Sequence, residues 1–175
     1  MSHTILWPTE MSSTSLKAIP QILSLAEKYH SRVIALYVAP DICSLFPAYG
    51  NYPNPEFIEK FQDWSLEKSK EKLHQLCSEE LHGCPNLDIR IVRGDAAEKI
   101  LELAAAEDTD MIVMTTRGQS LDEVGTQGTG FGSVAMRVAE QSPVPVQLVN
   151  PKVLIPRDSN FWHSKKQEGV CRPIC

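Results

Sequence analysis

Glycines are concentrated in one polar stretch of the chain. Residues 115–133 contain five glycines among threonines, serines and glutamines, and the stretch ends at Gly132-Ser133. Glycines let backbone N–H groups approach phosphate oxygens without an intervening side chain. A helix beginning at Ser133 would add unpaired N–H donors and a partial positive charge. The stretch therefore indicates a phosphate site, with a flexible surface loop as the equal alternative on composition alone.

Two carboxylates stand where they could face such a site. Glu10 follows the first apolar run, and Asp95 follows Gly94 directly before a helical stretch. Either could hold Mg²⁺ through water on a nucleotide, but for Asp95 a helix N-cap is the preferred interpretation. No histidine pairs with a nucleophile at a recognisable spacing, so no residue is assigned a catalytic role.

The elements that must position these residues alternate along the chain. Apolar runs predict five strands, and apolar residues at helical spacing predict four helices between them. Pro20 either kinks the first helix or marks its start. The expected strands cover residues 4–7, 32–38, 87–92, 111–114 and 145–149, and the helices cover residues 15–29, 56–80, 96–107 and 134–140.

This alternation predicts an α/β fold with a parallel, doubly wound sheet, because each helix returns the chain across the sheet before the next strand. In such sheets ligands bind at the carboxyl ends of the strands, where the strand order reverses. Four loops can converge there. They are the turns at residues 8–10, 38–40 and 94–95 and the glycine-rich stretch after Met114.

Two segments lie outside this simple pattern. Residues 40–55 hold four prolines besides Gly50 and read as a long loop. Residues 56–80 place Phe57, Phe61, Trp64 and Leu73 among many charges, which predicts an amphipathic helix.

Composition limits the class of protein. The chain has 175 residues, 42% hydrophobic and 22% charged, as expected for one globular domain. No apolar run approaches the roughly 20 residues of a membrane span, and no secretory signal opens the chain, so we expect a cytoplasmic protein without a membrane partner. A net charge of −5 without a basic stripe argues against nucleic acid. The five cysteines include no C-x-x-C pair, so neither a zinc site nor a disulfide framework is indicated.

The chain divides at residue 150. Residues 1–150 carry the alternating pattern, whereas residues 151–175 hold three prolines and five basic against two acidic residues. We therefore expect one domain over residues 1–150, followed by a basic C-terminal extension.

Four segments of the first 150 residues carry a resemblance. They are Ile5-Leu6-Trp7-Pro8-Thr9-Glu10, residues 94–104, residues 110–114, and Gly132-Ser133-Val134-Ala135 through Pro143-Val144-Pro145-Val146. In this order they resemble a universal stress protein of the UspA superfamily. The resemblance implies a five-stranded, Rossmann-like sheet in the order 3-2-1-4-5, and commonly a homodimer paired along the last strand, here Pro145–Val149. An unpaired edge strand is a liability that dimerisation would cover.

ATP-binding members of that family carry G-x2-G-x9-G-[ST] after the fourth strand. Here Thr115 stands at the first glycine and Gly118 at the second. Gly128-Thr129 satisfies the literal spacing, but we prefer Gly132-Ser133 with a loop four residues longer, because a phosphate site needs the helix N-terminus directly behind it.

The resemblance also implies roles for residues around the site. Pro8, Thr9, Glu10 and Val38 would hold the base and ribose, with Glu10 at the position of the family's nucleotide-contacting aspartate. Arg117, where a histidine is frequent, could contact a triphosphate with two hydrogen bonds. The remaining predicted contacts, most of them to the phosphates, are Met114, Thr115, Gly118, Gly132, Ser133, Val134 and Ala135.

Two functions follow from this resemblance. The first is binding of ATP or a related adenine nucleotide, with or without Mg²⁺, as a regulatory switch in the stress response, with at most weak hydrolysis. The alternative is a family member that binds no nucleotide and acts through protein contacts made by its altered loop and C-terminal extension. An adenylate-transferring enzyme is the weakest interpretation, because the sequence has no His-x-Gly-His and no Ser-Gly-Gly-x-Asp signature.

Overall fold

The computed structural model describes most of the first 152 residues. The described residues are 3–41, 55–81, 84, 86–118 and 131–152. Residues 42–54 of the predicted loop, the alternative motif Gly128-Thr129 and most of the C-terminal extension lie outside them. The predicted loop ends earlier than expected, because Pro55 is the first residue of a helix.

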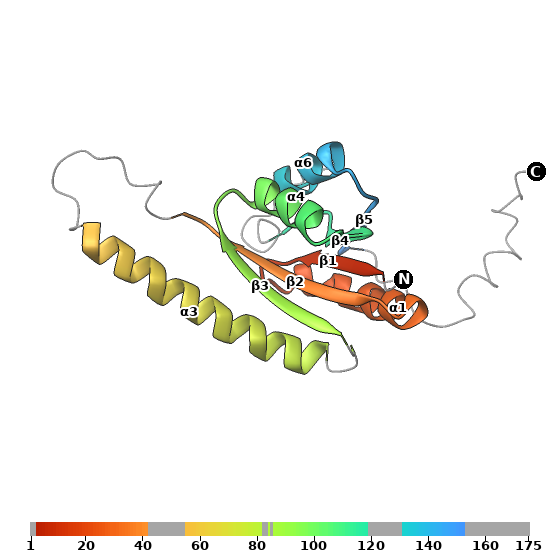
Figure 1. Ribbon diagram of the computed structural model, residues 1–175, viewed down its shortest axis with the longest axis horizontal. Helices are drawn as coiled ribbons and strands as arrows, with labels where there is room; N and C mark the ends of the chain where they lie inside the picture. Colours follow the sequence, from red (N-terminus) through yellow and green to blue (C-terminus); the bar gives the residue numbers. More distant parts are fainter. Residues whose placement is uncertain (1–2, 42–54, 82–83, 85, 119–130, 153–175) are drawn as a thin grey trace, which may run out of the picture.

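The chain forms a five-stranded parallel sheet in the order β3-β2-β1-β4-β5, as the resemblance implied (Figure 1). Within the described residues, four α-helices and one short 3₁₀ helix connect the strands. In chain order the elements are β1 (Thr4–Pro8), η1 (Ser15–Ala18), α1 (Ile19–Tyr29), β2 (Arg32–Ala39), α3 (Pro55–Glu80), β3 (Leu87–Arg93), α4 (Ala96–Ala106), β4 (Met111–Thr115), α6 (Ser133–Gln141) and β5 (Val146–Val149).

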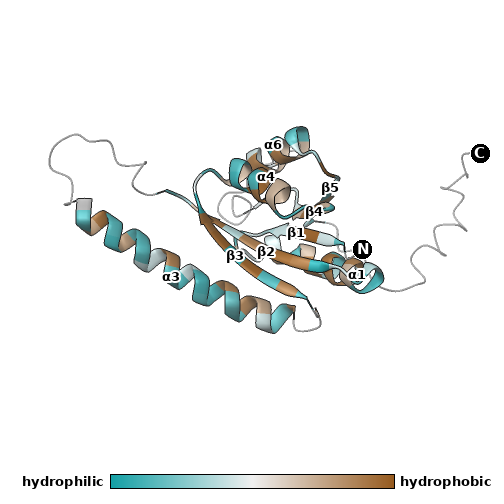
Figure 2. Cartoon of the chain, in the orientation of Figure 1, coloured by the Kyte–Doolittle hydropathy of each residue, from teal (hydrophilic) through white to brown (hydrophobic). Residues whose placement is uncertain are grey.

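The helices cover the two faces of the sheet in pairs. Along β1, Ile5 and Trp7 join the core beneath α1 and α3, whereas Leu6 joins the core beneath α4 and α6. This alternation follows from the two-residue period of a strand. Because both faces are covered, β1 and β2 are buried and apolar over most of their length (Figure 2).

The strand order fixes where a ligand site can form. From β1 the chain moves outward to β2 and β3, and it then returns to the other side of β1 with β4 and β5. The direction reverses between β1 and β4, which pair in register at Leu6 and Ile112. The carboxyl ends of these two strands therefore border the crevice where ligands of doubly wound sheets bind.

Local details differ from the expected boundaries by a residue or two. The first helix begins as η1, and Pro20 lies in the first turn of α1, so the proline marks the start of the α-helix rather than a kink. The last strand begins at Val146, one residue later than predicted.

Two of the cysteines can be placed. Cys77 and Cys84 are free thiols, and burial raises the pKa of the Cys77 thiol to about 11. Cys43, Cys171 and Cys175 lie outside the described residues. Across the described part of the chain, no helix combines the length and the apolar character that crossing a bilayer requires.

Candidate functional site: a cavity at the carboxyl edge of the sheet

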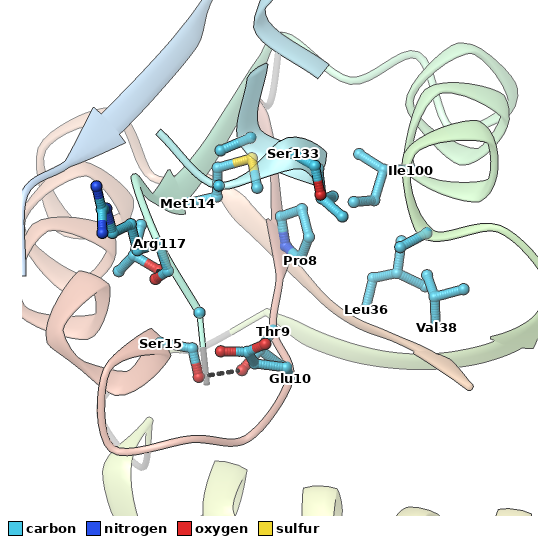
Figure 3. A pocket seen from close by; sticks show the side chains of 16 residues that line it. Pro8, Thr9, Glu10, Ser15, Leu36, Val38, Ile100, Met114, Arg117 and Ser133 are labelled. Atoms are coloured by element: carbon cyan, nitrogen blue, oxygen red, sulfur yellow. Dashed lines mark hydrogen bonds between the residues drawn. The ribbon is translucent and has the colours of Figure 1, made fainter. Parts of the chain in front are cut away.

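A cavity of about 320 Å³ opens at the point where the strand order reverses. Side chains from β1, β2 and β4 line it together with the first turns of α4 and α6 (Figure 3). Its lining residues are Pro8, Thr9, Glu10, Ser15, Leu36, Val38, Ala96, Ile100, Met114, Thr115, Arg117, Gly118, Gly132, Ser133, Val134 and Ala135.

The cavity brings together all twelve residues to which the resemblance assigned a nucleotide contact. It also includes four that sequence reasoning missed: Ser15, Leu36, Ala96 and Ile100. Leu36 and Ile100 fall within the predicted strand over residues 32–38 and the predicted helix over residues 96–107 and were given no site role. Leu36 nevertheless pairs with Pro8 across the strands and so lies near the cavity. The Ser12-x-x-Ser15 spacing, typical of a capped first turn, was the available signal for Ser15.

One wall of the cavity is the loop between β1 and η1, which is closed by its own hydrogen bonds. The Ser15 hydroxyl donates to the Ser12 carbonyl (2.9 Å), so the Thr9 hydroxyl donates to Ser15 Oγ (3.1 Å). Thr9 Oγ1 in turn accepts from the N–H of Met11 (3.1 Å), and the Thr9 N–H donates to the Leu36 carbonyl (2.8 Å). The loop thus satisfies these polar groups internally and holds a fixed shape.

Glu10 extends from this loop toward Gly118. The Ser12 hydroxyl donates to Glu10 Oε1 at 2.8 Å, which fixes the direction of the carboxylate. A Cβ on Gly118 would collide with both carboxylate oxygens. Gly118 therefore creates the space that the longer side chain of Glu10, compared with an aspartate, occupies.

The opposite wall is the N-terminus of α6. Gly132 is its N-cap with φ −64° and ψ 151°, and it has no side chain to cap the helix. The N–H groups of Ser133, Val134 and Ala135 have no partner within the helix, because an α-helix contains no carbonyl four residues before its first N–H groups. These donors, with the positive end of the helix dipole, border the cavity and favour an anion there.

The N-terminus of α4, on the same face of the sheet, is built differently. Asp95 caps it by accepting from the Glu98 N–H at 3.0 Å, and Arg137 of α6 donates to the same carboxylate at 3.0 Å. The Glu98 N–H, followed by the Arg137 guanidinium, lowers the pKa of Asp95 below its ordinary value. Asp95 does not line the cavity, so the N-cap interpretation made from the sequence holds.

The rest of the cavity is mostly apolar. Leu36, Val38 and Ile100 lie on one side of it and Arg117 on the other, with Pro8 and Met114 between them (Figure 3). An apolar cavity with a few convergent polar groups is the usual form of a small-molecule site.

Thr115 occupies the position where the motif has glycine. Its side chain is buried, and its hydroxyl donates to the Arg117 carbonyl at 2.8 Å. This bond fixes the side chain at the end of β4 and ties it to the loop that leads to Gly118.

Among the described residues, no cluster of side chains forms a metal site by itself. Within residues 3–41, 55–81, 84, 86–118 and 131–152, no three His, Cys, Asp or Glu side chains gather closely enough to hold a metal ion.

Comparison with known sequences identifies relatives over the whole sheet. The sequence model of the universal stress protein family matches residues 1–150. A universal stress protein of Thermus aquaticus is 36% identical over 101 residues, covering 55% of this chain and 70% of the relative. The universal stress protein MJ0577 of Methanocaldococcus jannaschii is 30% identical over 163 residues, covering 87% of this chain and 97% of the relative.

Solved structures agree with this fold. The structure of MJ0577 matches with a TM-score of 0.72 and 26% identity over 88% of this chain and 99% of that chain. A universal stress protein in complex with cAMP matches with a TM-score of 0.53 at 19% identity, and one from Archaeoglobus fulgidus in complex with dAMP with 0.54 at 15%. Each of these two matches covers 86% of this chain and 98% of the solved chain. At these identities the two structures establish the fold alone. With its family match across residues 1–150, its strand order and these structural neighbours, this chain belongs to the universal stress protein family.

Proposed function

We propose that this protein binds an adenine nucleotide, ATP, in the cavity at the carboxyl edge of the sheet. The observation that carries the proposal is the uncapped N-terminus of α6, whose first-turn N–H groups open into a mostly apolar cavity. An anion and an apolar ring belong in such a site, and a nucleotide supplies both.

The arrangement of the walls orients the nucleotide. The base and ribose lie against Pro8, Leu36 and Val38, and the phosphates lie against Ser133 and its neighbours at the start of α6. The two distant relatives solved with cAMP and dAMP support an adenine nucleotide as the ligand class for this family. Arg117 lies on the side of the cavity away from the apolar wall, where a guanidinium could contact the phosphates (Figure 3).

Mg²⁺ would enter with the phosphates. Magnesium keeps several waters and needs only one or two carboxylates besides the phosphates. Glu10 is the carboxylate among the described lining residues, and the Ser12 hydroxyl donates to its Oε1. Glu10 therefore fits an outer contact to a hydrated ion rather than a complete protein cage.

We assign the bound nucleotide a regulatory role in the stress response. In the described part of the cavity lining, the Ser15 and Thr115 hydroxyls donate to backbone carbonyls and the Glu10 carboxylate accepts from Ser12. This lining holds no histidine, cysteine or lysine beside them to act as a general base or covalent nucleophile. A bound nucleotide would instead contact both α6 and the loop between β1 and η1. It would thereby change the surface that a partner protein meets.

The protein is proposed to be a homodimer paired along the last strand. Among the described strands, β5 pairs with β4 alone, so its other edge is free of any described partner strand. Multi-angle light scattering at micromolar concentration should give at least the dimer mass, and a monomer mass would contradict this pairing.

One observation favours a second candidate, a family member that binds partners without nucleotide. Thr115 places a buried side chain where the nucleotide-binding motif has a glycine, and a Cβ there narrows the approach of phosphate to the backbone. The two candidates differ in one measurable property, the affinity for ATP.

Calorimetric titration of ATP with Mg²⁺ into the purified chain separates them, with GTP as the test of base selectivity. Mass spectrometry of the purified protein for a co-purifying adenine nucleotide makes the same distinction. The expected result is saturable binding of ATP at stoichiometric heat. No heat at millimolar ATP, and no co-purifying nucleotide, would exclude nucleotide binding and favour the second candidate.

A pair of matched variants locates the phosphates. Ser133→Asp adds an acidic group to the first turn of α6, where it stabilises the helix dipole but repels a phosphate. Ala139→Asp makes the same charge change on an exposed position of α6 outside the cavity. We expect Ser133→Asp to abolish ATP binding and Ala139→Asp to retain it, whereas equal affinities would place the phosphates elsewhere.

A further inference from the structure

One face of helix α3 packs against the sheet. Leu73 and Cys77 are buried in the core beneath α1 and α3. Near the other end, Gln62 is 1% exposed, and its Nε2 donates to the Pro40 carbonyl at the end of β2 (3.0 Å). These residues fix which side of α3 faces the domain. The N-terminal end of the helix extends past the carboxyl edge of the sheet (Figure 1).

Three aromatic residues lie on the outer face of the same helix. Phe57, Phe61 and Trp64 are 63%, 47% and 57% exposed. Trp64 follows Gln62 by two residues, which places it about 200° round the helix, on the side away from the sheet. The spacings of four and three residues align the three rings in one stripe. Phe61 and Trp64 already contact each other, with ring centroids 5.8 Å apart.

The sequence predicts only that this helix is amphipathic, and the structure shows that the three exposed aromatic residues lie away from the buried Leu73. None of the three side chains belongs to the core beneath α1 and α3, and none lines the cavity. Neither feature therefore explains the aromatic residues. A single exposed aromatic residue needs no explanation, but a contiguous stripe of three indicates a surface that another molecule covers.

We propose that this aromatic stripe of α3 packs against the same stripe of a second copy of the chain, with the two helices antiparallel. An interface between identical copies is isologous, so each contact occurs twice. In heptad terms Phe61 is an a position, and Phe57 and Trp64 are d positions. Antiparallel pairing then stacks Phe61 on Trp64 of the second copy and Trp64 on its Phe61.

The charges beside the stripe favour the antiparallel second copy. Lys60 and Glu67 flank the stripe on the same side, both are exposed, and neither forms an ion pair with the described part of its own chain. In the antiparallel register that pairs Phe61 with Trp64, Lys60 of each copy lies beside Glu67 of the other. Two opposite-charge pairs therefore border the aromatic contacts, which is the arrangement that sets orientation in helix pairs.

A third feature fits the same register. Lys68 continues the stripe at the next a position, and its ammonium donates to Glu71 of its own helix at 2.7 Å. In the dimer its side chain would lie over Phe57 of the second copy, at the place for a cation–π contact. The contact spans about three helix turns in each copy, a small area, so we expect a reversible dimer at micromolar concentrations. The inference does not depend on nucleotide binding.

Sedimentation analysis of charge variants tests the pairing. Lys60→Glu and Glu67→Lys each place like charges together twice, and we expect each to weaken this self-association about tenfold or more. The double variant Lys60→Glu with Glu67→Lys restores opposite pairs and should regain the wild-type mass. An equal mixture of the two single variants should also recover it, because a mixed dimer pairs opposite charges on both sides.

Controls separate this interface from the proposed β5 pairing and from misfolding. Lys70→Glu, on α3 but away from the stripe, makes the same charge change as Lys60→Glu and should associate as the wild type does. Phe61→Ala with Trp64→Ala should also abolish the α3 contact with unchanged circular dichroism, leaving a β5 dimer intact. Wild-type mass in Lys60→Glu and in the double alanine variant would overturn the proposal. Loss of mass in the single charge variants without recovery in the mixture would overturn the antiparallel register.

Discussion

Helices α4 and α6 lie side by side on one face of the sheet, yet their N-termini are finished in opposite ways. The N-terminus of α4 is capped by the Asp95 carboxylate, whereas that of α6 begins at Gly132 and has no capping side chain. Because both helices carry the same partial positive charge at this end, we propose that this difference decides which one receives a ligand. The α4 terminus already has its anion, whereas no described side chain caps the α6 terminus, which borders the cavity.

The largest effect is expected from giving α6 the cap that α4 has. At Gly132 a new Cβ would lie 3.5 Å from the Thr116 carbonyl oxygen, an ordinary contact, and φ is normal for any residue. Gly132→Asp should therefore fold and cap the helix, with its carboxylate occupying the anion site. We expect ATP affinity to fall by about 100-fold or more, since charge-assisted hydrogen bonds contribute about 1.5–3 kcal/mol each. Calorimetry measures the ATP affinity, and an unchanged affinity would contradict the assignment of the α6 terminus as the anion site.

A smaller loss should follow from disturbing the wall that faces α6. Gly118→Ala places a Cβ on the Glu10 carboxylate, which must leave its bond to Ser12. We expect about a tenfold loss of ATP affinity. Shortening the acid in the double variant Glu10→Asp with Gly118→Ala makes room again and should recover most of it. A double variant no better than Gly118→Ala would show that the collision is not the cause.

Removing the cap of α4 should affect stability and leave binding unchanged. Asp95→Ala leaves the Glu98 N–H without its acceptor, which costs about 1 kcal/mol in the free energy of unfolding. Chemical denaturation measures this loss, and calorimetry should give the wild-type ATP affinity. Reduced affinity in this variant would mean that α4, too, serves the ligand.

The contribution of Asp95 should also depend on pH. Its folded-state pKa lies below the ordinary value of 3.8, because the Glu98 N–H and then Arg137 favour the carboxylate. The stabilisation is therefore complete above the unfolded-state pKa and is lost as pH falls through the folded value. The stability gap between wild type and Asp95→Ala should shrink in acid below about pH 4. A gap that stayed constant down to pH 2 would disagree with this cause.

The smallest effect is expected at the link between the two helices. Arg137 and Asp95 are 42% and 45% exposed, so their ion pair is screened by water. Arg137→Met should lower the free energy of unfolding by less than about 1 kcal/mol and leave ATP binding unchanged. A larger loss in denaturation experiments would mean that the pair orients α6 as well as linking it to α4.

The residues that line the cavity were more predictable from sequence than the exposed outer face of α3. Pro8, Val38 and Met114 end strands, and Gly118 and Gly132 belong to the loop after β4, so strand order alone brings them to one edge. Leu36 and Ile100 were missed because a residue buried in the core can also form the wall of a cavity, and apolar periodicity does not separate these roles.

The outer face of α3 was not predictable from periodicity. Helical spacing detects apolar residues on one arc but does not say which arc meets the sheet. On α3 the orientation is set by Leu73, Cys77 and the polar Gln62, and the three aromatic residues lie on the opposite arc. A buried glutamine bonded to the Pro40 carbonyl is a tertiary contact with no local signature.

The most direct test of the account is a titration of the ¹⁵N-labelled protein with ATP and Mg²⁺, followed through the backbone amide resonances. The account predicts saturable shifts that are largest at the Ser133, Val134 and Ala135 amides, while the Glu98 amide, held by Asp95, stays nearly unchanged. Largest shifts at the α4 N-terminus, or no shifts at millimolar ATP, would contradict the assignment of the open α6 terminus as the phosphate site.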